Sequence, residues 1–408
     1  MRRQSRRILI YSHDSFGLGH LRRCRTVAHA LVEADPDLSV LILSGSPIIG
    51  SFDFRSRVDF VRVPGVIKLR NGDYTSLKLP MALEEMLALR ASIVEHTAKT
   101  FDPDLFLVDK EPLGLRGEAE STLALLRRRG VPCILGLRDV MDDPELLASE
   151  WERKNSVQAL ARYYDEVWVY GLPQICEPLA GIDLPASIRK SMVYTGYLPR
   201  EASSTAGSWT ALEKISSPYI LVTVGGGGDG EDIIDWVLRA YESDQQLPYP
   251  AVMVLGPFMA SERQAEFLGR AAKLRQVEAI TFEARIESLM EQAIGVVCMG
   301  GYNTFCELLS FDKRAVVIPR TQPRKEQFLR ASKAQELGLV HMLADDGERK
   351  AADMATALRH LPQQPLPSEV VVPGLLDGVE NVVRLAGRWQ QARREGSSKT
   401  PRAARSGL

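Results

Sequence analysis

The sequence predicts an α/β protein made of two doubly wound domains, each with a parallel sheet. Short apolar segments alternate with amphipathic segments of helical period along most of the 408 residues, as in βα repeats. This alternation stops at 200–217, where serine, alanine and threonine dominate. The chain is also longer than one hydrophobic core usually supports. We therefore expect a first domain at 1–199, a linker at 200–217 and a second domain at 218–374.

The elements of the first domain are read in chain order from apolar runs and helical periodicity. Strands are expected at 7–12, 38–43, 58–63, 104–108, 132–136, 166–170 and 191–194. Helices are expected at 20–34, 80–100, 116–129 and 149–163. The apolar stripe of the helix at 80–100 is more typical of a core contact than of a lipid contact.

The second domain repeats the same alternation. Its strands are expected at 219–224, 251–255, 278–282, 294–298, 315–318 and 339–342. Its helices are expected at 231–242, 261–273, 302–311 and 325–336. A final helix at 375–394 follows a proline-rich passage, and the Ser/Gly/Ala-rich end at 395–408 predicts a solvated tail.

Composition and charge narrow the class of protein. The hydrophobic fraction of 45% and charged fraction of 25% are ordinary for a globular protein, and the net charge of −1 gives no bulk attraction to nucleic acid. The five cysteines show neither a CxxC pair nor a metal-ligand spacing. No apolar run is long enough for a membrane span. We expect a cytoplasmic protein without a metal site, with at most a peripheral membrane contact.

A pair of glycines near residue 300 marks the first candidate ligand site. Gly300 and Gly301 follow a buried-strand pattern, and a helix is expected to begin around Asn303 and Thr304. The start of a helix offers free N–H groups and a positive dipole end, which suit a phosphate. Glu307 lies one turn further along, where a carboxylate can bind a pair of ribose hydroxyls.

A second pair of polar residues lies at the same edge of this expected sheet. Glu326 and Gln327 begin the helix after the strand that ends at Pro319. Open α/β sheets bind their ligands at the carboxyl ends of the strands. We therefore expect both side chains to face the ligand that the Gly300 turn binds.

A third glycine-rich segment follows the strand at 219–224. The glycines Gly225, Gly226, Gly227 and Gly228 precede a helix, and their successive N–H groups suit a diphosphate. The segment lacks the Lys-Ser/Thr of a P-loop, and no acidic residue supports a nicotinamide cofactor. Asp229 suits a sugar hydroxyl better than an anion. A flexible hinge loop is the alternative interpretation.

The first strand of the chain leads into a candidate base. Gly17 and Gly19 permit a tight turn after the strand at 7–12, and His20 follows in the first turn of the next helix. The helix N-terminus would lower the pKa of the imidazole and favour the neutral form that a general base needs. A purely structural turn is the alternative, and His13 is expected to make a local hydrogen bond.

Charged residues end two further strands of the first domain. Asp109 and Lys110 follow the strand at 104–108, and Arg138 follows the strand at 132–136. Because strand ends share one edge of a parallel sheet, these side chains are candidates to hold an acceptor or to steady His20. Solvated loops and structural ion pairs are the alternatives.

The second half of the chain resembles the donor domain of the family 28 glycosyltransferases, which include the lipid II-forming enzyme of peptidoglycan synthesis. In that family a glycine-rich turn, a helix-borne glutamate and a later glutamine hold the diphosphate, ribose and sugar of a UDP-sugar. The matching positions here are Gly300, Gly301, Thr304, Glu307, Glu326 and Gln327. Glu326 departs from the family pattern, which often has a glutamine there.

This resemblance implies the GT-B fold: two Rossmann-like doubly wound domains that face a cleft, with a terminal helix that crosses back to the first domain. The stretch from Gly17 to Arg23 also looks like the first motif of the sugar-nucleotide hydrolase of pseudaminic acid synthesis. In that relative the matching histidine activates water.

The resemblance further implies a glycosyltransferase that moves a hexose-type sugar from a nucleotide diphosphate sugar to an acceptor hydroxyl with inversion. His20 would be the base, and neither a metal nor a cofactor would be required. The partners would be a UDP-sugar and an acceptor glycan, lipid or small molecule, with no nucleic acid. The alternatives are a nucleotide-sugar hydrolase that uses water and a non-catalytic protein that binds a sugar nucleotide.

Overall fold

The structure, a computed structural model, describes residues 5–13, 19–68, 74–201, 218–226, 228–283 and 285–394. The chain divides into two compact units. Unit 1 contains Met1–Leu198 and Gly374–Leu408, and unit 2 contains Pro199–Pro373. Gly17, Gly227, most of the predicted linker (202–217) and the predicted tail at 395–408 lie outside the described residues.

Unit 1 is built on a parallel sheet of seven strands. In chain order the strands are β1 (Arg6–Ser12), β2 (Leu38–Ser44), β3 (Val58–Arg62), β6 (Leu105–Asp109), β7 (Cys133–Arg138), β8 (Glu166–Tyr170) and β9 (Met192–Tyr194). They lie in the order β3-β2-β1-β6-β7-β8-β9, and every neighbouring pair is parallel. Every residue of β6 and β8 is buried, as expected for a parallel strand covered on both faces.

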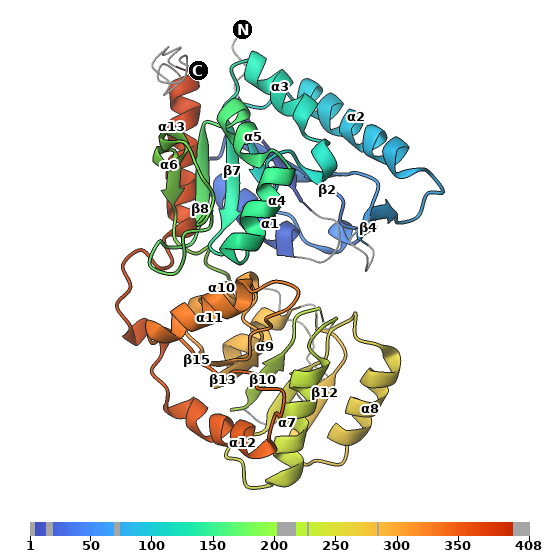
Figure 1. Ribbon diagram of the computed structural model, residues 1–408, viewed down its shortest axis with the longest axis vertical. Helices are drawn as coiled ribbons and strands as arrows, with labels where there is room; N and C mark the ends of the chain where they lie inside the picture. The colour runs from blue at the N-terminus through green and yellow to red at the C-terminus, as the bar shows by residue number, and fades with distance from the viewer. Residues whose placement is uncertain are drawn as a thin grey trace. The chain divides into compact units, whose positions relative to one another are not determined.

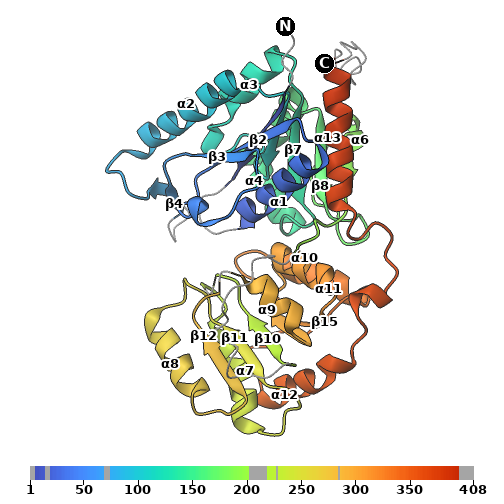
Figure 2. The same cartoon turned by 180° about the vertical axis from the view of Figure 1, so that it is seen from behind.

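The helices of unit 1 are α1 (Gly19–Ala34), α2 (Leu83–Phe101), α3 (Glu120–Arg128), α4 (Pro144–Arg153), α5 (Ser156–Tyr163), α6 (Ala186–Lys190) and α13 (Gly378–Arg394). Helices α4 and α5 cover one face of the sheet in Figure 1, and α1 and α13 cover the other, which Figure 2 brings to the front. The C-terminal helix α13 thus returns to unit 1 and packs against α1.

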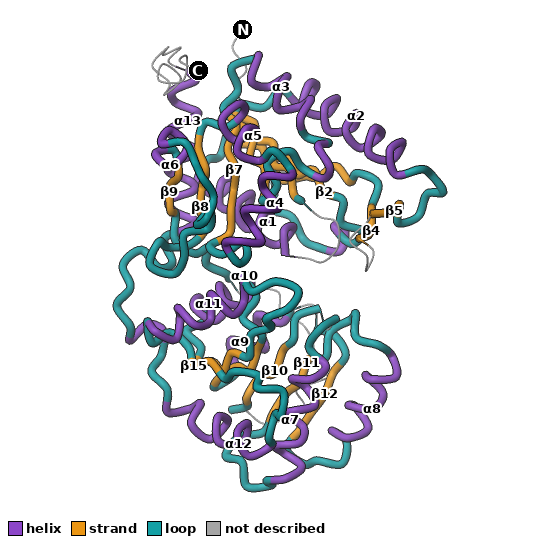
Figure 3. The backbone as a smooth tube through the Cα atoms, viewed as in Figure 1, coloured by secondary structure: helices purple, strands orange, loops and turns teal. Residues whose placement is uncertain are grey.

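Unit 2 has a second parallel sheet, of six strands, which Figure 3 shows as a separate group. In chain order the strands are β10 (Ile220–Thr223), β11 (Ala251–Val254), β12 (Val277–Ile280), β13 (Gly295–Cys298), β14 (Arg314–Val317) and β15 (His341–Met342). Their order is β12-β11-β10-β13-β14-β15, and all neighbouring pairs are parallel.

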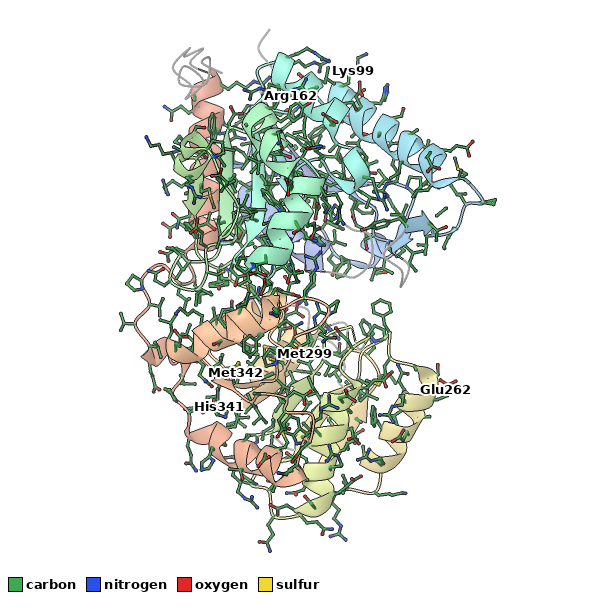
Figure 4. All side chains as sticks on the ribbon, in the orientation of Figure 1. Lys99, Arg162, Glu262, Met299, His341 and Met342 are labelled. Carbon is green, nitrogen blue, oxygen red and sulfur yellow. The ribbon has the colours of Figure 1, made fainter. Side chains whose placement is uncertain are left out.

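Two layers of helices cover the sheet of unit 2. These helices are α7 (Glu231–Ser243), α8 (Ser261–Ala271), α9 (Ile286–Gln292), α10 (Tyr302–Ser310), α11 (Glu326–Glu336) and α12 (Ala351–His360). Helices α8 and α12 pack against α7 on one face, and α9 packs against α10 on the other. Figure 4 labels Met299, which is buried in this unit, and Glu262, which lies exposed at the start of α8.

The predicted fold class is confirmed, and every expected strand lies close to its predicted bounds. Two helix predictions were wrong in detail. The helix expected at 149–163 is two helices, because Asn155 adopts a left-handed conformation with φ 52° between α4 and α5. The helix expected at 116–129 starts only at Glu120, because a short 3₁₀ turn, Leu115–Gly117, precedes it.

Some elements were not among the predicted ones, and shortness explains all of them except α12, which has ten residues. They are the antiparallel strands β4 (Val66–Lys68) and β5 (Tyr74–Ser76), and the helices α6, α9 and α12. Each of these strands spans three residues, and α6 and α9 are each at most seven residues long. Periodicity cannot be recognised over so few positions.

Candidate functional site

Each of the two sheets has its own switch point, where the strand order reverses, and several predicted site residues follow the strands at that point of their own unit. In unit 1 the strand order runs outward in opposite directions from β1 and β6, and in unit 2 from β10 and β13. Connections from two such strands leave on opposite sides of the sheet, which opens a crevice at their carboxyl ends. His20 follows β1 and Asp109 ends β6, while the glycines at 225–228 follow β10 and Gly300 follows β13.

His20 and Asp109 form a hydrogen-bonded pair in unit 1. The Nδ1 atom of His20 lies 2.5 Å from Oδ2 of Asp109. The carboxylate is buried, whereas the imidazole is 20% exposed. The Nδ1 atom has two neighbours: Oδ2 of Asp109 at 2.5 Å, which can only accept at neutral pH, and Nη2 of Arg23 at 3.1 Å, which can only donate. The shorter contact, to the carboxylate, places the proton of the neutral ring on Nδ1. This leaves Nε2 as the nitrogen that can accept a proton.

Arg23 binds the same carboxylate and reaches both of its oxygens. Its Nε and Nη2 atoms donate to Oδ1 of Asp109 at 2.8 and 2.6 Å, and the guanidinium is 2% exposed. Burial alone would raise the pKa of the Asp109 carboxyl, but Arg23 and His20 outweigh it and hold that pKa well below its usual range. Asp109 therefore stays ionised beside His20.

The pKa of His20 is lowered, but mainly for a reason other than the expected one. Burial is the largest cause, and Asp109 opposes it by raising the pKa of His20 through its charge and its hydrogen bond. The charges of Arg23 and Lys110 lower this pKa further. Desolvation therefore favours the neutral imidazole, the form that the sequence predicts.

The remaining acceptor-side candidates lie around this pair with different contacts. Gly19 is the first residue of α1. Lys110 has a positive φ of 68° directly after β6, and its Nζ lies 3.6 Å from a carboxylate oxygen of Glu111. Arg138 is the last residue of β7 and is partly buried. Its neighbour Asp139 is buried and accepts a hydrogen bond from the Tyr197 hydroxyl at 2.7 Å.

His13 lies closer to the pair than the sequence suggested. Its ring meets that of His20 edge-on, with centroids 5.6 Å apart. The expected local hydrogen bond of its Nδ1 atom is absent among the described residues. Burial lowers the pKa of His13 to about 3, so this second imidazole is neutral as well.

In unit 2 the turn after β13 requires glycine at one position. Gly300 has a φ of +72°, and a β-carbon there would lie 2.6 Å from Cγ1 of Val317. Gly301 caps α10 with a φ of −57° and has open space around it. The turn therefore presents the first N–H groups of α10 without side chains in front of them. Thr304 is partly buried in this first turn, and Glu307, one turn later, is only 2% exposed.

The glycine-rich segment after β10 forms the neighbouring loop. Gly225 has a φ of +64° with open space around it, and Gly228 is also open and exposed. Gly226 accepts a hydrogen bond from the backbone N–H of Phe258 at 2.9 Å. Gly230 packs so closely that a β-carbon would lie 2.2 Å from Cβ of Val224. The loop thus combines exposed backbone with one anchored end.

Glu326 and Gln327 are buried at the start of α11, and Arg320 links them to the glycine-rich loop. The Nη2 atom of Arg320 donates to Oε1 of Glu326 at 2.8 Å, and its backbone N–H donates to Oε1 of Gln327 at 3.1 Å. Its Nη1 atom forms an ion pair with Asp229. One guanidinium therefore connects the segments after β10 and β14.

Two more arginines bond to the Gly300 turn and to the first turn of α10. Arg330 on α11 is fully buried and donates to the carbonyl of Gly300 at 3.0 Å, which fixes the turn. Arg200 donates to Oδ1 of Asn303 at 2.7 Å. The amide of Asn303, expected to contact a donor, thus has an intramolecular contact in this structure.

Sequence reasoning missed Arg320 and Arg330, and it named Arg23 only as part of a motif, without a role. Two of the three carried a usable signal. Arg23 lies three residues after His20, on the same helix face, and Arg330 shares the buried face of α11 with Glu326 and Gln327. Arg320 lies in a loop, and no periodicity marks such a position.

The comparison with protein families gives a match within unit 2. The glycosyltransferase family 28 C-terminal domain matches residues 219–369. The match spans less than half of the chain and is confined to unit 2. The match covers the glycine-rich loop, the Gly300 turn and α11, so the residues predicted to bind a donor all lie inside it. No curated protein matches the chain in sequence.

Solved structures are similar to the whole chain. The calicheamicin glycosyltransferase CalG4 has a TM-score of 0.61 at 14% identity, covering 98% of this chain and 100% of CalG4. MurG of Acinetobacter baumannii has a TM-score of 0.53 at 14% identity, covering 94% of this chain and 99% of MurG. These similarities, with the family 28 domain, confirm the predicted resemblance to GT-B glycosyltransferases of family 28 type.

The same architecture also occurs with another activity. A UDP-N-acetylglucosamine 2-epimerase has a TM-score of 0.61 at 11% identity, with 98% of each chain covered. The similarity to solved structures therefore establishes the fold and does not identify the reaction, which depends on the residues of the site. Among the described residues, no helix has both the length and the apolar character needed to cross a membrane.

Proposed function

We propose that this protein is a glycosyltransferase that moves a hexose-type sugar from a UDP-sugar to an acceptor hydroxyl, with inversion at the anomeric carbon. The observation that carries this proposal is the His20–Asp109 pair at the switch point of the unit 1 sheet. A sugar hydroxyl is a poor nucleophile until a base removes its proton, and a neutral imidazole with a free Nε2 is such a base. The acceptor would be a glycan, a lipid or a small molecule.

The donor is assigned to unit 2. The glycine-rich loop and the first turn of α10 offer N–H groups to a diphosphate, and Glu307 would bind the ribose hydroxyls. Glu326 and Gln327 would bind the sugar. Structures of similar fold bind nucleoside diphosphates: LpCGTa was solved with UDP and VinC with dTDP, each with a TM-score of 0.60.

The chemical step follows from these assignments. Asp109 holds the Nδ1 proton of His20 while Nε2 takes the proton of the acceptor hydroxyl. The acceptor oxygen then attacks the anomeric carbon from the face opposite the leaving group, and one displacement inverts the configuration. The negative charge that develops on the leaving diphosphate is stabilised by backbone N–H groups and helix N-termini, so this step does not call for a metal.

A nucleotide-sugar hydrolase is the second candidate. The same base would activate water as readily as a hydroxyl, since both need only an acceptor for one proton. The test is product analysis by NMR after incubation of the purified protein with UDP-, dTDP-, GDP- and CMP-sugars, without and then with candidate acceptors. His20→Ala should abolish turnover and leave donor affinity nearly unchanged, whereas Glu307→Ala should weaken donor binding.

Each outcome decides between the candidates. Release of free sugar that depends on His20 and needs no acceptor would make the protein a hydrolase. Transfer to an added acceptor with inverted configuration would support the transferase. A His20→Ala variant that keeps its turnover would contradict both, and failure to bind any sugar nucleotide would refute the assignment of unit 2.

A further inference from the structure

Arg320 and Asp229 form an ion pair that spans the proposed donor site of unit 2. Arg320 comes after β14 and Asp229 lies in the loop after β10. Between these two strands lies β13, which ends at the Gly300 turn and α10. The ion pair thus reaches across the carboxyl end of β13, where the first N–H groups of α10 are presented.

The guanidinium of Arg320 is only partly engaged. Its two terminal nitrogens contact Asp229 and Glu326, but its Nε–H group is buried and has no acceptor among the described residues. A buried N–H without an acceptor is unfavourable, and an added ligand oxygen would satisfy it. Arginine also matches phosphate geometry well, because two parallel N–H groups can donate to two oxygens.

The two carboxylates on Arg320 are in different environments. Glu326 is buried, with its side chain 5% exposed, and it belongs to the rigid start of α11. Asp229 is 45% exposed and lies on the glycine-rich loop. An exposed partner on a loop exchanges more easily than a buried partner on a helix, because water compensates the charge that it leaves.

We propose that Arg320 binds the diphosphate of the donor and that Asp229 competes with this diphosphate for the guanidinium when no donor is present. This inference rests on the assignment of unit 2 as the donor-binding unit. A diphosphate at the first turn of α10 and the carboxylate of Asp229 would repel each other if both stayed beside Arg320. Donor binding therefore replaces Asp229 on Arg320 and frees the glycine-rich loop from this contact.

The test is binding by isothermal titration calorimetry to three pairs of probes: UDP and uridine, dTDP and thymidine, GDP and guanosine. The variants are Arg320→Gln, Asp229→Asn and the double variant. Arg270 on α8 provides matched controls, because it also pairs with carboxylates on more than one element, Asp235 and Glu242 on α7 and Glu266 on α8. Arg270→Gln and Asp235→Asn change the same charges away from the predicted site.

We expect Arg320→Gln to weaken binding of the preferred nucleoside diphosphate about tenfold or more, as the loss of one charge-assisted contact implies. Asp229→Asn should strengthen it by about three- to tenfold, since the competitor is gone. Neither change should alter affinity for the parent nucleoside, and neither control variant should alter either affinity. In the Arg320→Gln background, the gain from Asp229→Asn should largely disappear.

The last comparison separates competition from simple repulsion. If Asp229→Asn strengthens diphosphate binding equally with and without Arg320, Asp229 acts only by its charge and the competition is refuted. Equal losses for the diphosphate and the nucleoside in Arg320→Gln would refute the phosphate contact. A wild-type protein that binds none of the three diphosphates would refute this inference together with the assignment of unit 2.

Discussion

The His20–Asp109 pair gives the prediction that the structure constrains most tightly. Asp109→Asn keeps the shape of the side chain and removes its charge. In the protein, Asp109 raises the pKa of His20 against the lowering effect of burial, Arg23 and Lys110. Without the carboxylate only the lowering causes remain, so the pKa of His20 should fall further below 6.5.

The size of the fall follows from the contact. A hydrogen bond to a charged group contributes about 1.5–3 kcal/mol, and one pKa unit corresponds to about 1.36 kcal/mol. We therefore expect the pKa of His20 to drop by about one to two units. A weaker and less well oriented base should also lower kcat by about 10²- to 10³-fold. The acid limb of the pH profile of kcat should move to lower pH by the same one to two units.

The pKa of His20 can be measured directly by NMR titration of its ring protons, without any substrate. Asp139→Asn serves as a control, since Asp139 is buried near the same sheet edge but bonds to Tyr197. Arg23 would lose its buried partner, so folding is checked by circular dichroism, and the double variant Asp109→Asn/Arg23→Gln removes the uncompensated charge. A His20 pKa that stays constant or rises in Asp109→Asn would refute the reasoning.

Three further predictions concern the fold around the sites. Gly300→Ala should lower the free energy of unfolding, measured by urea titration, by about 1–3 kcal/mol, because φ is +72° at this position. The same substitution should abolish nucleotide binding. Gly301→Ala, at a φ of −57°, is the control that should be tolerated. Burial lowers the pKa of His13 to about 3, so between pH 6.5 and 5 the unfolded chain binds a proton that the folded chain does not, and the free energy of unfolding decreases as the pH is lowered. His13→Gln should reduce this pH dependence by up to about 1.4 kcal/mol per pH unit. An unchanged pH dependence would contradict the burial effect. Glu166→Ala leaves two buried indole N–H groups without their acceptor. It should therefore lower the free energy of unfolding by about 2–5 kcal/mol and shift tryptophan fluorescence to the red. An unchanged free energy of unfolding would show that this carboxylate does not hold α13.

The Glu166 contact also illustrates how the C-terminal helix is held. Trp168 on β8 and Trp389 on α13 both donate to Oε2 of Glu166, at 3.0 and 2.8 Å. Sequence periodicity predicts the helix at 375–394, and the family resemblance predicts its return. Only the folded structure shows the buried carboxylate between two tryptophans that are more than two hundred positions apart in the chain.

Sequence alone was sufficient for the strands of the two parallel sheets, because each is a short apolar run that must be covered on both faces, but not for β4 and β5. It was also sufficient for the positions of His20, Gly300 and Glu307. Each follows or precedes an element whose direction is known, and in a parallel sheet the direction decides which edge the residue occupies. The residues at the two switch points could thus be named from local patterns.

Tertiary structure decided which of those residues meet. Asp109, Lys110 and Arg138 were equal candidates by their places at strand ends, and the structure shows Asp109 bonded to His20, because β6 is the strand beside β1. Arg23 and Arg320 acquire their roles through partners that are distant in sequence. Periodicity reports which face of an element is buried, whereas strand order and side-chain reach determine which charges pair, and those depend on the whole folded chain.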